Sequence, residues 1–175
     1  AVQSSSKIQF FKKKGKISEL QKLISSNPVS GSIGIAHTRW ATHGSPTDFN
    51  SHPHLNESGT IAVVHNGIIE NYQPIKETLI KKGVLFKSET DTEVLAHLIS
   101  TIYYQEKQIS LKNAVQAALQ EVVGTYGIVV LCSDEPDTLI AAKMGSPLVL
   151  GVGEGEYFLA SDASPIVGYT RKVIY

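Results

Sequence analysis

Apolar residues recur at intervals of three or four positions in four parts of the chain, which is the spacing of one face of a helix. The segments are 18–26, 71–82, 90–102 and 110–122. Each opens on a residue that commonly caps helices, namely Ser18, Asn71, Thr90 and Ser110. Thr90 and Glu93 also have the spacing of a capping box. Asn27-Pro28 and Gly83 are expected to end the first two helices.

Short apolar runs between turn residues predict strands elsewhere. They lie at 7–13, 32–37, 61–64, 126–132, 138–143, 148–152 and 157–160. The last four follow each other closely and are typical of an antiparallel sheet. Helices in the middle with strands on either side predict a layered α+β fold, in which two sheets are covered by helices.

One long polar segment, 39–59, interrupts this pattern. Loops of this length inside a domain are usually functional. No repeat or linker divides the chain, so we expect one domain over residues 1–175. Ala1-Val2 is typical of the end of a strand, and the apolar run 171–175 has no turn signal after it. We therefore expect the domain to be incomplete at both ends.

Composition narrows the classes of function. The chain has 175 residues, of which 42% are hydrophobic, and a formal net charge of zero. This balance argues against a nucleic-acid or membrane-surface partner, and no apolar stretch approaches the ~20 residues of a membrane span. The single cysteine, Cys132, excludes a disulfide framework and fits a cytoplasmic setting. It lies in a run typical of a buried strand, where a thiol is a poor nucleophile.

The first candidate for chemistry is the run from His37 to Gly44. An arginine at a strand end, here Arg39, can hold a carboxylate through two parallel hydrogen bonds. Thr42 and His43 would add polar contacts. The alternative is a structural Arg39 paired with a local acid, with Trp40 filling a gap in the core.

The second candidate is His65-Asn66-Gly67. Asn-Gly is a strong signal for a tight hairpin turn, but the residues after it run quickly into a helix. The alternative is a strand end that presents the Asn66 amide and the Gly67 N–H. Those are the donors that an oxyanion hole requires.

The third candidate is Asp91, in Thr90-Asp91-Thr92-Glu93. It is either a favourable negative charge at a helix N-terminus or a carboxylate that receives a substrate ammonium group. Together, Arg39, Asn66-Gly67 and Asp91 would fit an amino acid with a side-chain amide, glutamine or asparagine, provided that they converge in space.

The histidines are a further candidate group, as metal ligands. His37, His43, His52, His54 and His65 lie close in sequence, but no cysteine or carboxylate completes a zinc spacing. Hydrogen bonds that order the loop are the expected role of His52 and His54. We expect no metal, and the absence of a Walker or dinucleotide loop leads us to expect no cofactor.

Several of these stretches resemble the class II glutamine amidotransferases, which are N-terminal-nucleophile enzymes. The residues of these stretches point to the hexosamine-forming branch of the family, which converts fructose 6-phosphate to glucosamine 6-phosphate. The matching segments are 34–44, 50–54, 64–71, 88–93, 145–149 and 160–162. The resemblance implies an αββα sandwich, with two antiparallel sheets between helical layers, and hydrolysis of L-glutamine to glutamate and ammonia.

The resemblance also implies roles for single residues. Arg39 would hold the glutamine α-carboxylate, Asp91 the α-ammonium group, and Asn66 with Gly67 the oxyanion. Thr42 and His43 would line the same pocket. Trp40 would belong to the region that closes over the substrate and gates ammonia.

The chain departs from the family pattern at its start, where Ala1 stands without the nucleophilic N-terminal cysteine and the opening strand and helix. The sugar-phosphate isomerase domain, through which family members form homodimers, is also absent. Two alternatives stay open: a class II amidotransferase with another acceptor domain, and a non-catalytic amino-acid-binding module.

Overall fold

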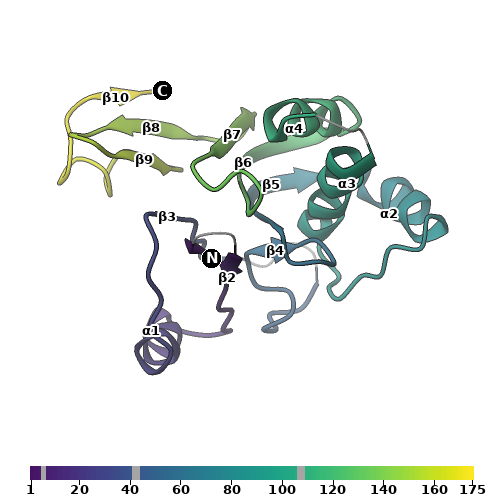
Figure 1. The fold of residues 1–175 in the computed structure, drawn as a ribbon, viewed down its shortest axis with the longest axis horizontal. Coiled ribbons are helices and arrows are strands. Elements are labelled where there is room, and N and C mark those ends of the chain that lie inside the picture. Colours follow the sequence, from purple (N-terminus) through teal and green to yellow (C-terminus); the bar gives the residue numbers. More distant parts are fainter. Residues whose placement is uncertain (5–6, 41–43, 106–108) are drawn as a thin grey trace.

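The computed structural model describes residues 1–4, 7–40, 44–105 and 109–175. Its centre is a four-stranded antiparallel sheet in the order β4-β5-β6-β7, with helices α2, α3 and α4 over one face (Figure 1). The strands are β4 His54–Leu55, β5 Ile61–Ile69, β6 Gly124–Cys132 and β7 Leu139–Met144. The helices are α2 Tyr72–Lys81, α3 Asp91–Gln105 and α4 Leu111–Gln120.

Two smaller antiparallel sheets come from the two ends of the described chain (Figure 1). The first has the order β2-β1-β3, and the second has the order β10-β8-β9. Their strands are β1 Val2–Ser4, β2 Lys7–Gln9, β3 Ile33–Gly34, β8 Val149–Val152, β9 Tyr157–Ala160 and β10 Val173–Ile174. Helix α1, Ile17–Ser26, connects β2 to the segment before β3.

The central sheet is buried on both faces, and this explains the unbroken apolar run in β5. Ile61 and Val63 face a core formed with α3 and α4. Ala62 and Val64 face a second core that includes Ile33 and Ile35 from the N-terminal part of the chain. Strands buried on both sides read as continuous hydrophobic segments rather than as an alternation. The α+β sandwich expected from the sequence is confirmed.

Strand β5 is longer than the sequence indicated. It continues through Asn66 and Gly67 to Ile69, and these residues pair with residues 124–127 of β6. The hairpin-turn interpretation of Asn66-Gly67 is therefore wrong. The opening strand is shorter than predicted, because β2 ends at Gln9.

Of the four predicted N-caps, Ser110 and Thr90 cap their helices through the side chain, and Ser18 and Asn71 do not. The Ser110 hydroxyl accepts a hydrogen bond from Asn113 N at 3.3 Å, as predicted. Helix α1 begins at Ile17, so Ser18 is not its cap. The Asn71 side chain bonds to Glu121 O and Val123 N, and so fastens the start of α2 to the entry of β6.

The capping box at α3 is half formed. Thr90 Oγ1 accepts a hydrogen bond from Glu93 N at 3.3 Å. The Glu93 carboxylate accepts instead from the N–H groups of Lys87 and Ser88, at 2.9 and 2.6 Å. The acid thereby holds the segment before α3 against the first turn of the helix.

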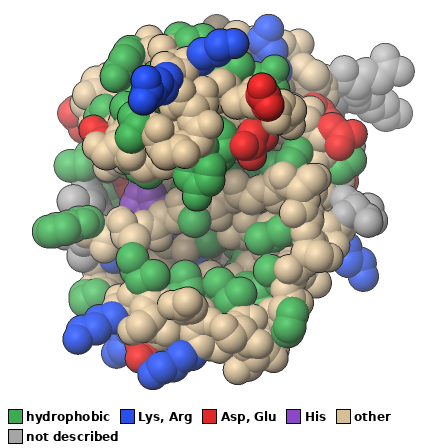
Figure 2. Space-filling view, turned by 90° about the vertical axis from the view of Figure 1, so that its left-hand side faces the viewer, with side chains coloured by type: hydrophobic (Ala, Val, Ile, Leu, Met, Phe, Trp, Pro, Cys, Tyr) green, Lys and Arg blue, Asp and Glu red, His purple; other side chains and the backbone are tan. Residues whose placement is uncertain are grey.

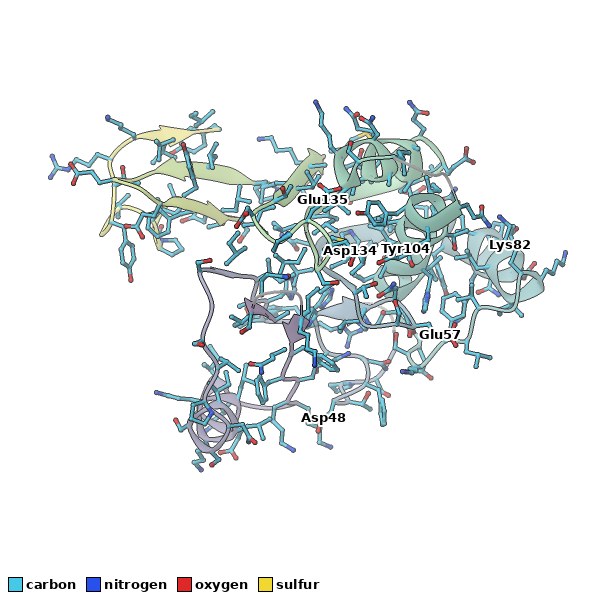
Figure 3. All side chains as sticks on the ribbon, in the orientation of Figure 1. Asp48, Glu57, Lys82, Tyr104, Asp134 and Glu135 are labelled. Carbon is cyan, nitrogen blue, oxygen red and sulfur yellow. The ribbon has the colours of Figure 1, made fainter. Side chains whose placement is uncertain are left out.

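Polar contacts fasten the helical layer to the sheet at the far end of α3. The Tyr104 hydroxyl lies 3.0 Å from Asp134 Oδ2, and Glu135 Oε1 accepts from Leu111 N at 2.6 Å (Figure 3). Both acids lie in the turn between β6 and β7. None of the helices in the described ranges is long and apolar enough to cross a membrane.

Candidate active site

A cavity of about 350 Å³ lies where the second half of β5, the start of α3 and the segment after β3 meet. Arg39, Trp40, Asn66, Gly67 and Asp91 all line it. Three candidate clusters that are far apart in the sequence therefore converge on one space. Thr42 and His43 lie outside the described residues.

The β5 side of the cavity presents Asn66 from an exposed position in the strand. Gly67 follows it with a backbone φ of 142°, a value that residues with a side chain rarely adopt. A Cβ atom there would overlap the carbonyl oxygen of Thr125 on the paired strand. Glycine is therefore required for the close approach of β5 and β6 beside the cavity.

Asp91 is the first residue of α3 and is only 5% exposed. Its Oδ2 atom accepts a hydrogen bond from Ile69 N at 2.9 Å, and its Oδ1 atom lies 3.4 Å from the Thr92 hydroxyl. The positive end of the helix dipole also stabilises an anion at this position. The result is a buried carboxylate on the cavity wall, which can receive a cationic group.

The opposite wall comes from the segment after β3. Arg39 is partly buried, and its Nη2 atom donates to the Gly44 carbonyl oxygen at 3.2 Å. Trp40 is 91% exposed. The interpretation in which Trp40 fills a gap in the core is therefore wrong.

Histidines form the floor between these walls. His52 Nε2 and His65 Nδ1 lie 3.2 and 3.1 Å from the same hydroxyl, Thr92 Oγ1. The ring centroids of His37 and His52 are 4.2 Å apart. His54, behind them, contacts Thr90 Oγ1 at 3.1 Å. The hydrogen bonds expected for His52 and His54 are present.

Burial lowers the pKa values of these imidazoles. It lowers the pKa of His37 to about 4, helped by the charges of His65 and Arg39. Burial, with the charge of Lys12, lowers the pKa of His54 to about 3 against the opposing effect of Glu93. The pKa of His52 is also lowered, first by burial and then by neighbouring imidazoles. Within the described ranges, no group of three or more His, Cys, Asp or Glu side chains is arranged to hold a metal ion.

These shifts predict acid sensitivity that begins well above the range of the carboxylates. A histidine with a lowered folded-state pKa stabilises the fold above its ordinary pKa of 6.5, and this stability is lost as pH falls towards the folded value. We expect the free energy of unfolding to fall below pH 6.5, by up to about 1.4 kcal/mol per pH unit for each such histidine.

Thermal unfolding between pH 8 and about 5, where carboxylates stay ionised, measures this effect. A His54→Asn variant should show a shallower dependence than the unchanged protein. A melting temperature that is flat across this range would contradict the prediction.

A neighbouring cavity of about 430 Å³ opens beside the first and shares His37, Thr38, Trp40 and Asn66 with it. One of its other walls comes from the C-terminal sheet, through Leu159, Ala160 and the adjacent Ser161. Figure 2 shows this side of the molecule as a hollowed face between an upper and a lower mass. No thiol lines either cavity among the described residues. Cys132 is fully buried in β6, where burial raises its pKa.

Some lining residues carry no signal in the local sequence. Thr125 enters because β6 pairs with β5, and its neighbours in the chain do not indicate this. Thr92 lies in a segment whose polar residues could all be explained as helix caps. In the structure its hydroxyl forms hydrogen bonds with both His52 and His65. Thr38, next to Arg39, also lines both cavities.

Solved structures define the class of protein to which this fold corresponds. One is the glutamine phosphoribosylpyrophosphate (PRPP) amidotransferase from B. subtilis, complexed with ADP and GMP. It superposes with a TM-score of 0.76 and 27% identity, over 97% of this chain and 37% of that one. A structure described as the allosteric regulatory enzyme of purine biosynthesis gives a TM-score of 0.72 and 28% identity, over 89% and 34% of the two chains. The fold is that of the amidotransferases.

Sequence comparison then identifies the family. Residues 37–167 match the model of the glutamine amidotransferase domain, and the chain belongs to this family.

Two named relatives are similar to this chain over nearly its whole length. The glutamine–fructose-6-phosphate aminotransferase [isomerizing] of Chlorobaculum tepidum is 52% identical over 96% of the chain. The protein of the same name from Bacteroides thetaiotaomicron is 51% identical over 99%. The chain spans 28% of the length of each of these relatives.

Proposed function

We propose that this chain is the glutamine-binding part of an enzyme that hydrolyses L-glutamine to glutamate and ammonia. The ammonia would serve to convert fructose 6-phosphate to glucosamine 6-phosphate. The observation that carries the proposal is the convergence of Arg39, Asn66-Gly67 and Asp91 on one cavity. The names of the similar aminotransferases support the choice of acceptor.

The chemistry of the cavity matches the three polar parts of glutamine. The guanidinium of Arg39 would hold the α-carboxylate, since arginine binds carboxylates with two parallel hydrogen bonds. The buried carboxylate of Asp91 would take the α-ammonium group. Asn66 and the N–H of Gly67 would bind the side-chain oxygen as it becomes an oxyanion.

The reaction requires a nucleophile that the described walls lack. We propose a cysteine thiol from outside residues 1–175, at the amino terminus of the processed polypeptide, with its α-amine as base. The thiolate would attack the amide carbon, ammonia would leave, and water would hydrolyse the thioester to release glutamate. In support, the sequence has one cysteine, Cys132, and it lies in the core.

The surrounding loop would complete the site. Thr42 and His43 would line the glutamine pocket, and Trp40 would belong to the region that closes over the substrate and gates ammonia. The high exposure of Trp40 at the rim of both cavities is consistent with that role.

The acceptor half would lie elsewhere in the same polypeptide. We propose that residues 1–175 are a class II amidotransferase domain that is incomplete at both ends. A sugar-phosphate isomerase domain would follow it, and the enzyme would form a homodimer in the cytoplasm. The greater length of the named aminotransferases supports a further domain.

Replacing Asp91 by Asn should weaken glutamine binding while preserving the fold. The amide oxygen can still accept from Ile69 N, but the charge that faces the substrate ammonium is lost. Hydrogen bonds to charged groups contribute about 1.5–3 kcal/mol, so KM for glutamine should rise by roughly tenfold to a hundredfold. Steady-state glutaminase assays measure this.

Glu89→Gln is the matched control, because Glu89 is an exposed acid that bonds to Asn50 and does not line the cavity. It should leave KM nearly unchanged. An Asp91→Asn enzyme with unaltered KM would exclude the ammonium-binding role.

The function itself is tested by giving the polypeptide that carries the nucleophile glutamine labelled with ¹⁵N in its amide, together with fructose 6-phosphate. We expect labelled glucosamine 6-phosphate and an equal amount of glutamate. Glutamate without the amino sugar would indicate another acceptor domain. Binding without glutamate release would indicate a non-catalytic amino-acid-binding module.

A further inference from the structure

A separate cavity of about 320 Å³ lies on the other side of the first turns of α3. It is enclosed by the segment after β2, strand β4, the segment after α2, and α3 itself. It shares no lining residue with the proposed glutamine pocket. Asp48 and Glu57, which line it, are labelled in Figure 3, where Glu57 lies towards α2.

The walls of this third cavity are mainly apolar. Phe10, Phe49 and Leu85 contribute to them and remain 48%, 69% and 67% exposed. Leu55 adds a further apolar surface. Exposed apolar patches that border a cavity mark ligand or partner sites, because burying them beneath an apolar molecule is favourable.

Two of the acids of the third cavity, Glu93 and Asp48, already have donors, and the other acid, Glu57, is exposed. The Glu93 carboxylate accepts from the Ser88 hydroxyl at 2.7 Å in addition to the two backbone N–H groups before α3. Asp48 accepts from Lys14 N at 2.6 Å and from the Lys13 ammonium at 3.3 Å. Glu57 is exposed at the rim, where water screens its charge.

A nitrogen atom on the wall, by contrast, lacks a hydrogen-bond partner. His97 is 3% exposed, and its Nε2 atom makes no hydrogen bond within the described structure. The nearest acid oxygen, Glu93 Oε1, is 3.8 Å away, beyond hydrogen-bond distance. A buried polar atom without a partner is costly, and a ligand atom in the cavity could satisfy it.

A cationic donor lines the same space. The Lys12 ammonium has three protons and donates to the Phe49 carbonyl oxygen at 2.8 Å. Burial, partly offset by the charge of Glu93, lowers the Lys12 pKa to about 8. A bound anion would reverse the effect of burial and favour the charged form of the lysine.

We propose that the third cavity is a binding site for a small carboxylate with an aromatic or aliphatic body. The body would lie on Phe10, Phe49 and Leu85, and the carboxylate would accept hydrogen bonds from the Lys12 ammonium and from His97 Nε2–H. A cavity of this size is at the lower end of the range for small-molecule sites, which restricts the ligand to one or two rings.

Titration of the protein with 1-naphthoate tests the proposal. Isothermal calorimetry should give one saturable site, and the His97 ring-nitrogen signal in ¹⁵N spectra should shift. Lys12→Met keeps the apolar stem and removes the charge, so binding should weaken by about tenfold or more. Circular dichroism establishes that the variant is folded.

The matched control is Lys16→Met, which makes the same charge change at an exposed residue that neither lines the third cavity nor donates to Asp48. It should leave naphthoate affinity unchanged, and the neutral 1-naphthalenemethanol should bind more weakly than the acid. Absence of binding, equal binding by the alcohol, or an unaffected Lys12→Met variant would each overturn the proposal. Displacement of naphthoate by L-glutamine would also overturn it, because it would place the probe in the other cavity.

Discussion

An Asn66→Ala variant of the polypeptide that carries the nucleophile should lose about 10²–10³ in glutaminase turnover, with KM for glutamine largely unchanged. Losing one oxyanion-hole donor typically has a cost of this size, because the donor acts on charge that develops only in the transition state. Asn66 occupies an exposed position in β5, so its truncation should not disturb the core. Rates of glutamate release at saturating and limiting glutamine separate the two kinetic constants.

Asn113→Ala provides the comparison, since Asn113 is an exposed asparagine on α4 that does not line the glutamine cavity. Its turnover should match that of the unchanged enzyme. Normal turnover in the Asn66→Ala enzyme would remove Asn66 from the oxyanion hole. A rise in KM with unchanged turnover would instead assign Asn66 to ground-state binding.

The second large effect is expected on stability. In a Gly67→Ala variant the new methyl group would overlap the Thr125 carbonyl oxygen, at a φ value that alanine rarely adopts. Overlap with backbone cannot be relieved by a side-chain rotation, so β5 and β6 would have to separate beside the cavity. We expect a loss of at least about 3 kcal/mol in the free energy of unfolding, measured by urea denaturation.

A Gly59→Ala variant separates the cost of the steric overlap from the cost of the backbone conformation. Gly59 also has a positive φ, 73°, but a Cβ atom there would meet nothing within 4 Å. The cost should therefore be limited to about 1–2 kcal/mol, the usual penalty for a left-handed residue. Equal losses of stability in the two variants would show that the close approach of β5 and β6 at Gly67 contributes little to the cost of the substitution.

The buried acids of the first turn of α3 divide between two cavities. Asp91 lines the proposed glutamine pocket, and Glu93, two positions later, lines the third cavity. Their neighbours Thr90 and Thr92 contact His54 and His52, respectively. A single helical turn therefore positions polar groups for both spaces, and a ligand that moved this turn would affect both.

The sequence alone determined the elements that depend on local spacing. Periodicity predicted the four helices, and Ser110 marked the start of α4 as its side chain does in the structure. The alternation of short apolar runs and turns predicted the C-terminal strands, with β9 at the expected 157–160. These features depend on residues within a few positions of each other, so the local sequence contains the information.

Only the tertiary structure decided how Asn66-Gly67 is used. Locally this pair favours a hairpin turn, but nine residue pairs with β6 hold it in an extended strand. The same pairing brings Thr125 to the cavity, and the packing of α3 on the sheet brings Asp91 opposite Arg39. Contacts between residues far apart in the chain fixed these outcomes. Because such contacts are set by burial of the whole core rather than by neighbours in the chain, the sequence could suggest that the site converges, but only the packed fold brings its residues together.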